Sequence, residues 1–319
     1  MLAFVLSGGG NRGALQVGAL QILLEAGIVP DMLVGTSVGA VNAAFLAVDP
    51  TPRGAYRLAD IWRRVRKDDL YPGTHLTALW NTIRGREGLF SNANWFAFLQ
   101  KHTPAKRFGD LRIPAYAVAT DLETGRQVVF GDNPDDPIVD ALMASTALPP
   151  LHPPWVYEGR RLIDGGAVAD LPVRVAIERG ATEIIALNLA NPHTPGEQLR
   201  SLVGIMNRAV SVLIWRHVEA DLEHAAMLGN VRLRTIDLRV EMTLAPWDFS
   251  QTSRLIAEGR NITRRALEAD PYQLTPPQQR LRDRLAETLS VKTASMFRKT
   301  TAWMRRNAAS SPETRNARP

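Results

Sequence analysis

The stretch "DMLVGTSVGAVNAAFLAV" (residues 31–48) sets a short apolar run directly against a run of small residues. The spacing predicts a buried strand at 31–35 and a closely packed helix at 38–48. The turn between them reads "GTSVG" (35–39), a G-x-S-x-G pattern. A sharp strand-to-helix turn of this kind can lift a serine hydroxyl above a sheet, where small neighbours relieve the crowding. A plain glycine-rich turn would show the same letters, so this motif alone leaves both interpretations open.

The chain begins with a similar strand–turn–helix unit. "LAFVL" (2–6) reads as a buried strand, "GGGNRG" (8–13) follows it, and residues 12–26 read as a helix that ends at Gly27. Bare N–H groups in such a loop, at a helix N-terminus, can hold a pyrophosphate or the oxyanion of an acyl-transfer intermediate. Two strand–helix units joined by short loops predict a parallel sheet with helices on its faces.

The rest of the chain continues this alternation less regularly. The segment 114–130 is expected to form a hairpin around Gly125, and the proline-rich segment 147–155 to be irregular, because proline fixes φ and lacks an amide donor. Further strands are expected at 160–166, 182–189 and 231–240. Helices are expected at 57–67, 92–101, 138–145, 173–180, 198–228 and 251–269.

The charge of the chain is concentrated near its end. The formal net charge is +6, and residues 271–319 hold ten Lys or Arg but three Asp or Glu. Residues 276–306 are expected to form a basic amphipathic helix, which either packs on the protein body or contacts an anionic membrane surface. No aromatic–basic pattern typical of nucleic-acid recognition accompanies this charge, so no nucleic-acid partner is expected.

Two compositional features bear on the cell compartment. The chain has no cysteine, which excludes disulfides, a thiol nucleophile and a cysteine metal site, and which is compatible with a reducing cytoplasm. The first apolar run is short and has no basic region before it, and no stretch of about 18 apolar residues follows. We therefore expect no signal peptide and no transmembrane segment, and a cytoplasmic protein that can lie peripherally at a membrane.

A third motif is "LIDGGAVADLP" (162–172), in which Asp164 stands at a predicted strand end before two glycines. A partly desolvated aspartate can take a hydroxyl proton directly, so Asp164 is a candidate base for Ser37 with no histidine between them. The alternative is a common Asp-Gly turn.

Two better-known enzyme classes fit less of the sequence. A dinucleotide site would use the loop at 8–13, but it wants an acidic residue at the end of the second strand, and Asp31 stands at its start. An ordinary α/β-hydrolase needs a late histidine. Of the later histidines, His193 lies in a predicted loop, and His217 and His224 lie on a predicted helix where surface or packing roles are expected. His152, among prolines, is a further candidate to line a site.

The three motifs occur in one order, "GGGNRG", "GTSVG" and "DGG", and with them the sequence resembles the patatin-like phospholipases. Further similar strings are "GALQVGALQILLEAGIVPD", "ATDLETGRQVVF", "ASTALPPL" and "DGGAVADLPV", so the resemblance covers roughly residues 3–190. It implies an α/β fold, a three-layer α/β/α sandwich with a mostly parallel central sheet, followed by C-terminal helices.

The same resemblance implies a serine acyl hydrolase that cleaves carboxylic esters of lipids. Ser37 would attack the ester carbonyl, Asp164 would act as its base, and the N–H groups of Gly9 and Gly10 would hold the oxyanion. The substrate would be a phospholipid, lysophospholipid or neutral acylglycerol, and transfer of the acyl group to an acceptor other than water stays open. No metal and no cofactor is implied. A non-catalytic acyl-lipid binder or membrane regulator with an idle dyad is the alternative.

The remaining site positions follow from the same motifs. Arg12 would fix the glycine loop or meet a lipid phosphate, and Asp170 stands where the family often has asparagine. A second carboxylate close to Asp164 would raise the proton affinity of that residue. The oxyanion or substrate-binding positions are Gly8, Gly9, Gly10, Arg12 and Gly13. The elbow and turn positions are Gly35, Gly39, Gly165 and Gly166.

Two further expectations concern the acyl chain and the domains. Five apolar residues are expected either to line a chain-binding groove or to belong to the core, namely Leu89, Phe90, Trp95, Phe96 and Phe98. Residues 1–270 are expected to form the acyl hydrolase domain, 271–308 a basic helical extension and 309–319 a disordered tail. The oligomeric state is left open.

Overall fold

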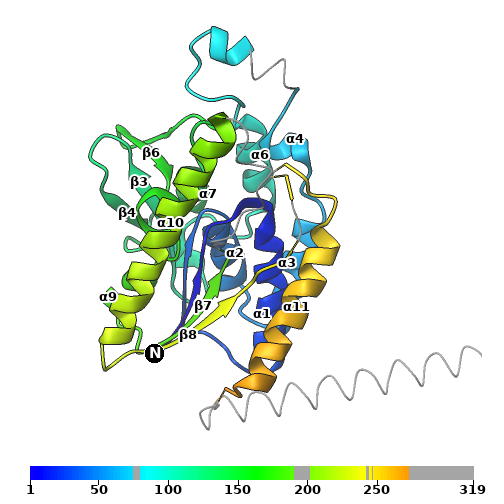
Figure 1. The fold of residues 1–319 in the computed structure, drawn as a ribbon, viewed down its shortest axis with the longest axis vertical. Coiled ribbons are helices and arrows are strands. Elements are labelled where there is room, and N and C mark those ends of the chain that lie inside the picture. Colours follow the sequence, from blue (N-terminus) through cyan, green and yellow to red (C-terminus); the bar gives the residue numbers. More distant parts are fainter. Residues whose placement is uncertain (75–79, 190–201, 242–243, 246, 273–319) are drawn as a thin grey trace, which may run out of the picture. The chain divides into compact units, whose positions relative to one another are not determined.

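A mixed sheet of eight strands organises the described part of the chain in this computed structural model (Figure 1). The strand order is β5-β6-β3-β2-β1-β7-β8, and β4 is a further partner of β3. The strands are β1 (Leu2–Leu6), β2 (Met32–Thr36), β3 (Ala115–Asp121), β4 (Gln127–Phe130), β5 (Trp155–Tyr157), β6 (Arg160–Asp164), β7 (Glu183–Asn188) and β8 (Arg232–Asp237).

The centre of the sheet is parallel and one side of it is antiparallel. β3, β2, β1, β7 and β8 run parallel, whereas β6 and β4 pair antiparallel with β3, and β5 pairs antiparallel with β6. β1 and β2 are buried at every residue, as expected for parallel strands covered on both faces. The predicted mostly parallel sheet is therefore confirmed, with an antiparallel margin formed by the hairpins.

Helices cover both faces of this sheet. α2 and α7 pack on β3 on one face, and α8, α9 and α10 pack on the other. Figure 1 shows the sheet lying between the green helix α10 and the group of α1, α3 and α11, so the predicted three-layer architecture is confirmed. The helices are η1 (Gly10–Arg12), α1 (Gly13–Glu25), α2 (Val38–Ala47), α3 (Pro52–Trp62), α4 (Lys67–Leu70), α6 (Ala93–His102), η2 (Phe108–Asp110), α7 (Ile138–Ser145), α8 (Gly166–Ala169), α9 (Val173–Glu178), α10 (Leu202–Met227) and α11 (Thr252–Ala269).

The strand alternation divides the core between the two faces. Ala3 and Val5 of β1 join one buried cluster with Val173 and Ala176 of α9 and Val218 of α10. The intervening residues of β1 must point to the opposite face, because successive side chains of a strand alternate. Both faces of β1 are apolar, which is why "LAFVL" reads as a continuous hydrophobic run.

The structure describes residues 1–74, 80–189, 202–241, 244–245 and 247–272. Residues 1–24 and 29–272 form one compact unit that holds the whole sheet. Of the expected extension and tail at 271–319, only Pro271 and Tyr272 are among the described residues, so these two domain assignments stay predictions. Within the described residues, no helix is both long enough and apolar enough to cross a bilayer.

Most predicted elements lie within a few residues of their observed bounds, but the helix expected at 57–67 was placed wrongly. The helix α3 begins at Pro52 and ends at Trp62. Thr51 caps it by accepting the N–H of Gly54 at 3.3 Å, and a proline at the first helical position suits a helix start. The residues after Trp62 turn and form the separate short helix α4.

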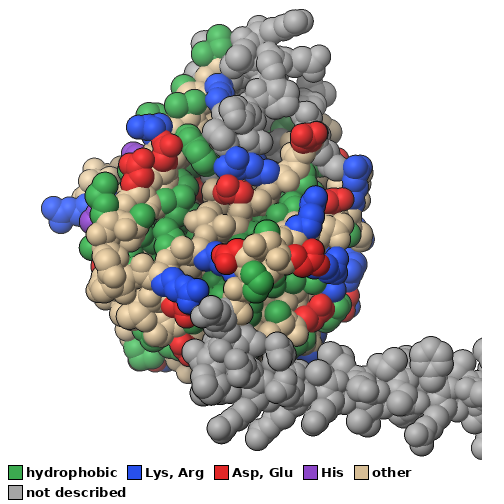
Figure 2. All heavy atoms as spheres, turned by 60° about the horizontal axis from the view of Figure 1, so that its bottom comes forward, with side chains coloured by type: hydrophobic (Ala, Val, Ile, Leu, Met, Phe, Trp, Pro, Cys, Tyr) green, Lys and Arg blue, Asp and Glu red, His purple; other side chains and the backbone are tan. Residues whose placement is uncertain are grey.

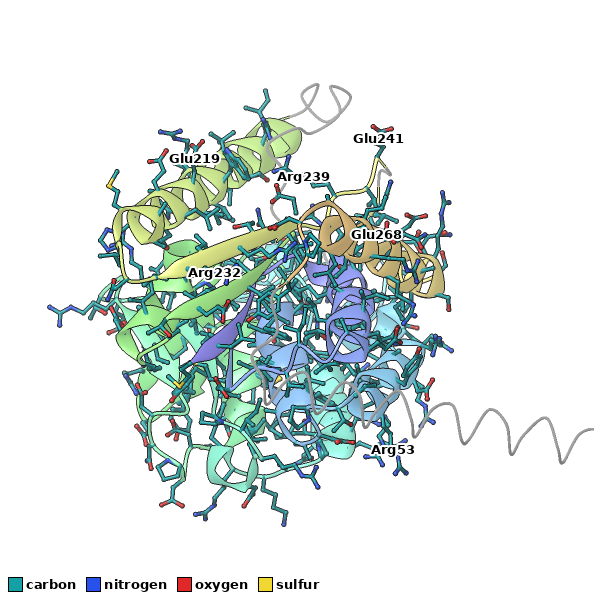
Figure 3. All side chains as sticks on the ribbon, turned by 90° about the horizontal axis from the view of Figure 1, so that it is seen from below. Arg53, Glu219, Arg232, Arg239, Glu241 and Glu268 are labelled. Carbon is teal, nitrogen blue, oxygen red and sulfur yellow. The ribbon has the colours of Figure 1, made fainter. Side chains whose placement is uncertain are left out.

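The edge strand β8 lies between α10, which carries Glu219, and α11, which carries Glu268 (Figure 3). Arg234 of β8 donates from Nη2 to the carbonyl of Ala266 near the end of α11, at 2.8 Å. The C-terminal end of α11 is thereby tied to β8 by a hydrogen bond.

Two glycines let α1 and α11 approach each other closely. A methyl group on Gly18 would lie 2.0 Å from the carbonyl oxygen of Ile256, and one on Gly259 would lie 2.0 Å from that of Leu15. Both obstacles are backbone atoms, so a side chain at either position must push the two helices apart.

We expect Gly259→Ala to lower the free energy of unfolding by about 1–3 kcal/mol, because overpacking outweighs the gain in helix propensity. Urea denaturation followed by circular dichroism measures this. Gly229→Ala is the matched control, since a methyl group there meets no atom within 4 Å, and it should change stability by less than about 0.5 kcal/mol. Equal stability of both variants would show that α1 and α11 do not cross this tightly.

Candidate active site

The strand register brings the second and third motifs together. Thr36, the last residue of β2, pairs with Val118 of β3, and the next residue of β3, Ala119, pairs with Asp164 at the end of β6. Because β6 runs antiparallel to β3, its carboxyl end stops beside the carboxyl end of β2. The residue after Thr36 is Ser37, so Ser37 and Asp164 meet above adjacent positions of one strand.

Ser37 stands on a strained turn. Its backbone has φ 56° and ψ −126°, a conformation that non-glycine residues rarely adopt and that costs about 1–3 kcal/mol. The residue lies at the N-terminus of α2, and its side chain makes no capping hydrogen bond. The hydroxyl is therefore left for another use, and the positive end of the helix dipole lies beside it.

The glycines of the elbow are required by close approach of backbone. A methyl group on Gly39 would lie 2.2 Å from the carbonyl oxygen of Leu6, and one on Gly35 would lie 2.3 Å from the backbone of Gly39. The helix α2 thus begins directly against the end of β1. This close start places Ser37 beside the glycine loop that follows β1.

A serine that the motifs did not single out holds the elbow in place. Ser145, the last residue of α7, accepts the N–H of Ser37 at 2.8 Å and donates to the carbonyl of Val118 at 2.6 Å. Its hydroxyl bridges the nucleophile turn to β3. The string "ASTALPPL" contains this serine, but nothing in the sequence alone shows that it reaches Ser37.

Asp164 is a buried carboxylate with few stabilising partners. Its side chain is 5% exposed and accepts the N–H of Gly166 at 2.8 Å. Burial raises the pKa of the Asp164 carboxyl to about 6, while the Ser37 hydroxyl and the Gly166 N–H act in the opposite direction by stabilising the charge. A carboxylate of raised pKa that faces a serine hydroxyl is suited to accept its proton near neutral pH.

The glycine loop offers free donors at the same place. The N–H of Gly8 donates to the carbonyl of Asp170 at 3.1 Å, and that of Arg12 donates to Gly9. Among the described residues, no acceptor bonds the N–H groups of Gly9 and Gly10. Gly10 has φ 58°, which turns the loop into η1. These two N–H groups are the candidates for holding an oxyanion.

The other predicted loop positions contribute in different ways. Gly13 packs, since a methyl group there would lie 2.4 Å from Val38 of α2. The Nε of Arg12 donates to the carbonyl of Gly9 at 3.4 Å, so this side chain contacts the loop it belongs to. Burial lowers the pKa of the Arg12 guanidinium, and the charge of Asp170 partly offsets that effect.

The turn after Asp164 also needs glycine, because the backbone of β3 lies close to it. A methyl group on Gly165 would lie 2.4 Å from the carbonyl oxygen of Val118. The turn leads into the short helix α8, whose last carbonyl, that of Ala169, accepts a hydrogen bond from Thr36 at 2.6 Å. The helix α8 is thus held against the end of β2, directly beside the elbow.

A polar network that the sequence did not reveal supports the two helices behind the site. Asn42 of α2 donates to Gln16 of α1 at 2.9 Å and accepts from the indole of Trp62 at 2.8 Å. Asn11 of the glycine loop donates to the carbonyls of Ala245 and Asp248, at 2.8 and 2.7 Å. The Asn11 side chain therefore holds the segment before α11 against the glycine loop.

The histidines take the places expected of structural or surface residues. His152 is buried, and its Nε2 lies 2.7 Å from the carbonyl of Leu70. Its ring stacks on Tyr71, and burial lowers the pKa of His152, so its neutral form is favoured. His217 and His224 are exposed on α10, and His193 lies outside the described residues.

Four of the five predicted groove residues, all except Leu89, take part in aromatic ring pairs. Phe96 stacks on Trp155, Trp95 stacks on Phe98, and Phe90 packs edge-on against Tyr71. Burial and, second, the charge of Asp164 raise the pKa of Tyr71 to about 12. Whether an acyl chain lies along this cluster stays a prediction.

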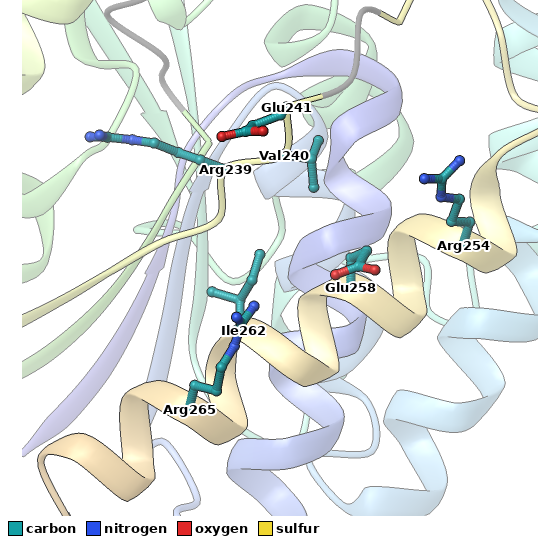
Figure 4. A pocket seen from close by; sticks show the side chains of 7 residues that line it. All are labelled: Arg239, Val240, Glu241, Arg254, Glu258, Ile262 and Arg265. Atoms are coloured by element: carbon teal, nitrogen blue, oxygen red, sulfur yellow. The ribbon is translucent and has the colours of Figure 1, made fainter.

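A cavity of about 380 Å³ lies elsewhere, between the segment after β8 and α11 (Figure 4). Figure 4 shows its lining side chains coming from these two elements, and Ser37, Asp164 and the glycine loop contribute none of them. The lining residues are Arg239, Val240, Glu241, Arg254, Glu258, Ile262 and Arg265. Its mixed charges do not suit an acyl chain, so we do not assign it to the dyad.

The fold and the site place the chain in the class of α/β proteins that carry a serine on a strand-to-helix elbow. A sequence model of the patatin-like phospholipases matches residues 4–177, more than half of the chain. The chain belongs to the patatin-like phospholipase family.

Individual relatives agree with this assignment. Patatin-like phospholipase domain-containing protein 7 of Mus musculus is 31% identical over 195 residues, covering 60% of this chain and 14% of that protein. Lysophospholipase NTE1 of Mycosarcoma maydis is 30% identical over 220 residues, covering 65% of this chain and 11% of that protein. The chain thus spans a small part of the length of these relatives.

Among solved structures, VipD from Legionella pneumophila has a TM-score of 0.46 and 18% identity, covering 84% of this chain and 66% of that one.

Proposed function

We propose that this chain is a lipid acyl hydrolase that cleaves carboxylic esters through an acyl-enzyme on Ser37. The observation that carries the proposal is the meeting of Ser37, on its strained elbow, with the buried Asp164 at the end of β6. Family membership supports the lipid substrate class, because the relatives are named as phospholipases and lysophospholipases.

The first half of the reaction forms the acyl-enzyme. Oγ of Ser37 attacks the ester carbonyl carbon while Asp164 takes the hydroxyl proton. The carbonyl oxygen gains the negative charge and accepts hydrogen bonds from the N–H groups of Gly9 and Gly10, with the N-terminus of α2 adding positive potential. The C–O bond to the alcohol then breaks, and the proton on Asp164 passes to the leaving oxygen.

The second half releases the fatty acid. Asp164, again charged, takes a proton from a water molecule that attacks the acyl carbonyl, and the same two N–H groups hold the new oxyanion. The bond to Oγ breaks and Ser37 regains its proton from Asp164. Each step uses Asp164 without a histidine, in keeping with the engagement of His152 by Leu70.

The proposal covers several lipid classes as substrate and an anionic membrane as the surface on which they lie. Phospholipids, lysophospholipids and neutral acylglycerols all offer the ester that the dyad needs, and Arg12 beside the loop suits a lipid phosphate. Figure 2 shows acidic and basic side chains interspersed over one face of the described part. By sequence, residues 271–319 hold ten Lys or Arg and three Asp or Glu, so the excess positive charge of the chain is carried by this segment. We propose that this segment contacts anionic membrane.

The test is hydrolysis of p-nitrophenyl butyrate and p-nitrophenyl palmitate by the full chain, followed by release of p-nitrophenol. Turnover of either ester supports the proposal, and the ratio of the two rates gives the chain-length preference. The other candidate, a lipid binder with an idle dyad, predicts no turnover of either ester, with or without phosphatidylglycerol vesicles.

The pH dependence follows from the raised pKa of Asp164. We expect kcat/KM for p-nitrophenyl butyrate to fall about tenfold per unit below about pH 6, because a protonated Asp164 cannot accept the Ser37 proton. Stopped assays that are quenched before the p-nitrophenol is read measure this without interference from its own ionisation. A rate that stays constant down to pH 4.5 would mean that the working base is not a buried carboxylate.

A further inference from the structure

Asp170 is a second buried carboxyl beside the dyad that the proposed mechanism does not use. It follows α8 and is 8% exposed. A methyl group on Gly166 would lie 3.2 Å from Oδ1 of Asp164 and equally 3.2 Å from Oδ1 of Asp170. The two carboxyl groups therefore flank one glycine, within a few ångströms of each other.

The same side chain lies against the glycine loop. A methyl group on Gly8 would lie 2.5 Å from Oδ1 of Asp170 and 3.3 Å from Cβ of Ser37. The carbonyl of Asp170 also accepts the N–H of Gly8, so backbone and side chain both hold this residue to the loop. A charge on Asp170 would thus lie next to the place where Gly9 and Gly10 offer their N–H groups.

The charges around Asp170 do not balance when both acids are ionised. Arg12 from η1 is the cation whose charge acts on Asp170, and Asp164 from β6 is the anion. Beyond Asp164, Tyr71 is neutral because its pKa is raised. The guanidinium of Arg12 thus acts on Asp170, while the second buried carboxylate, Asp164, acts on it in the opposite direction, because buried like charges repel strongly.

We propose that Asp170 is a further functional residue of this site, which holds a proton against the glycine loop while Asp164 carries the charge, and whose ionisation weakens the oxyanion position. The inference rests on the proposed function, since it concerns the same dyad. A neutral Asp170 leaves the loop free of negative charge, and an ionised Asp170 sets a negative charge beside the developing oxyanion.

The order of ionisation agrees with this assignment. Burial first, and then the charge of Asp164, raise the pKa of Asp170 to about 7, while Arg12 and the N–H of Gly8 oppose that rise. As pH rises, Asp164 therefore loses its proton first and Asp170 second, and the pair titrates as a coupled unit. The active form has a charged Asp164 and a protonated Asp170, so its population passes through a maximum.

The test compares the pH profile of kcat/KM for p-nitrophenyl butyrate in the wild type, Asp170→Asn and Asp170→Ala. The wild type should rise through about pH 6 and decline above about pH 7. Asp170→Asn keeps the shape and removes the charge, so the decline should disappear. The rising limb should stay near pH 6, because Asp170 still holds its proton and is uncharged when Asp164 ionises. At pH 8, kcat/KM of Asp170→Asn should exceed that of the wild type by up to about tenfold, since only about a tenth of a group of pKa 7 stays protonated there.

Two further variants keep the outcome interpretable. Asp170→Ala should lose the decline as well, once its rate at each pH is divided by the folded fraction that circular dichroism gives at that pH. Glu268→Gln removes a negative charge from the exposed end of α11 and should keep the wild-type profile. A decline above pH 7 that persists in Asp170→Asn, or a loss of activity by the same factor at every pH, overturns the proposal. Full activity of a Ser37→Ala variant would instead overturn the proposed function itself.

Discussion

Ser37→Ala should lower kcat for p-nitrophenyl butyrate on the order of 10³- to 10⁶-fold, the range found when a catalytic serine is removed. The loss is this large because no other group can form the acyl-enzyme at that position. The protein should keep its fold, since the Ser37 side chain makes no capping hydrogen bond and alanine bears the same backbone strain as serine. Initial rates with matched circular dichroism spectra and melting curves measure both points.

A serine-to-alanine substitution outside the site is the control for Ser37→Ala. Ser211 lies exposed on α10, and Ser211→Ala should retain activity within about twofold of the wild type. Substantial hydrolysis by folded Ser37→Ala would show that the elbow is structural and that the ester is cleaved by another group.

Asp164→Asn should lower kcat about 10³- to 10⁴-fold, a range expected when the group that activates a nucleophile is lost. The amide oxygen of asparagine can still accept the N–H of Gly166, so the turn into α8 should survive. What is lost is the ability to take the Ser37 proton. The rate measurement is the same as for Ser37→Ala, with enzyme concentrations raised to detect the residual activity.

The stability of Asp164→Asn gives a second, independent readout. Burial raises the pKa of Asp164 in the folded state above its unfolded value, so ionisation opposes folding at pH values above the unfolded pKa. Asparagine removes that opposition, and the melting temperature at pH 7.5 should be unchanged or higher. A variant that is inactive but markedly less stable would point to a structural role of Asp164 instead.

Asp121 offers a matched control for the charge. It ends β3, next to β6, but accepts the N–H groups of Glu123 and Thr124, which lower its pKa. Asp121→Asn should therefore keep activity near that of the wild type. The contrast between the two aspartates rests on environment, since both stand at strand ends of the same sheet.

Local signals were sufficient for most of the fold. "LAFVL" predicts β1 because both of its faces are buried, and Gly125 marks the hairpin between β3 and β4. The predicted start of α3 at residue 57 is wrong, because Thr51-Pro52, a cap followed by a first-turn proline, begins the helix at Pro52. The short strand β5 could not be foreseen after four prolines, since pairing with β6 supplies its hydrogen bonds.

Some residues of the site can be predicted from local motifs, and others depend on how distant segments pack together. Motif order and family resemblance were enough to predict Ser37 and Asp164 as partners, and the register of β2, β3 and β6 gives a geometric reason for it. Ser145 and Asn42 could not be predicted, because their roles depend on which helices pack together. The distance between Asp164 and Asp170 was open as well, since α8 alone decides how the chain turns back.

The most direct test of the Ser37–Asp164 assignment is covalent labelling with a fluorophosphonate, followed by intact mass and peptide mapping. The wild type should gain a single adduct, located on Ser37, and Ser37→Ala should gain none. Asp164→Asn should label at least about a hundredfold more slowly, because removal of a base slows attack by Oγ. An adduct on any other residue, or labelling of Asp164→Asn at the wild-type rate, would contradict a serine that is activated directly by Asp164.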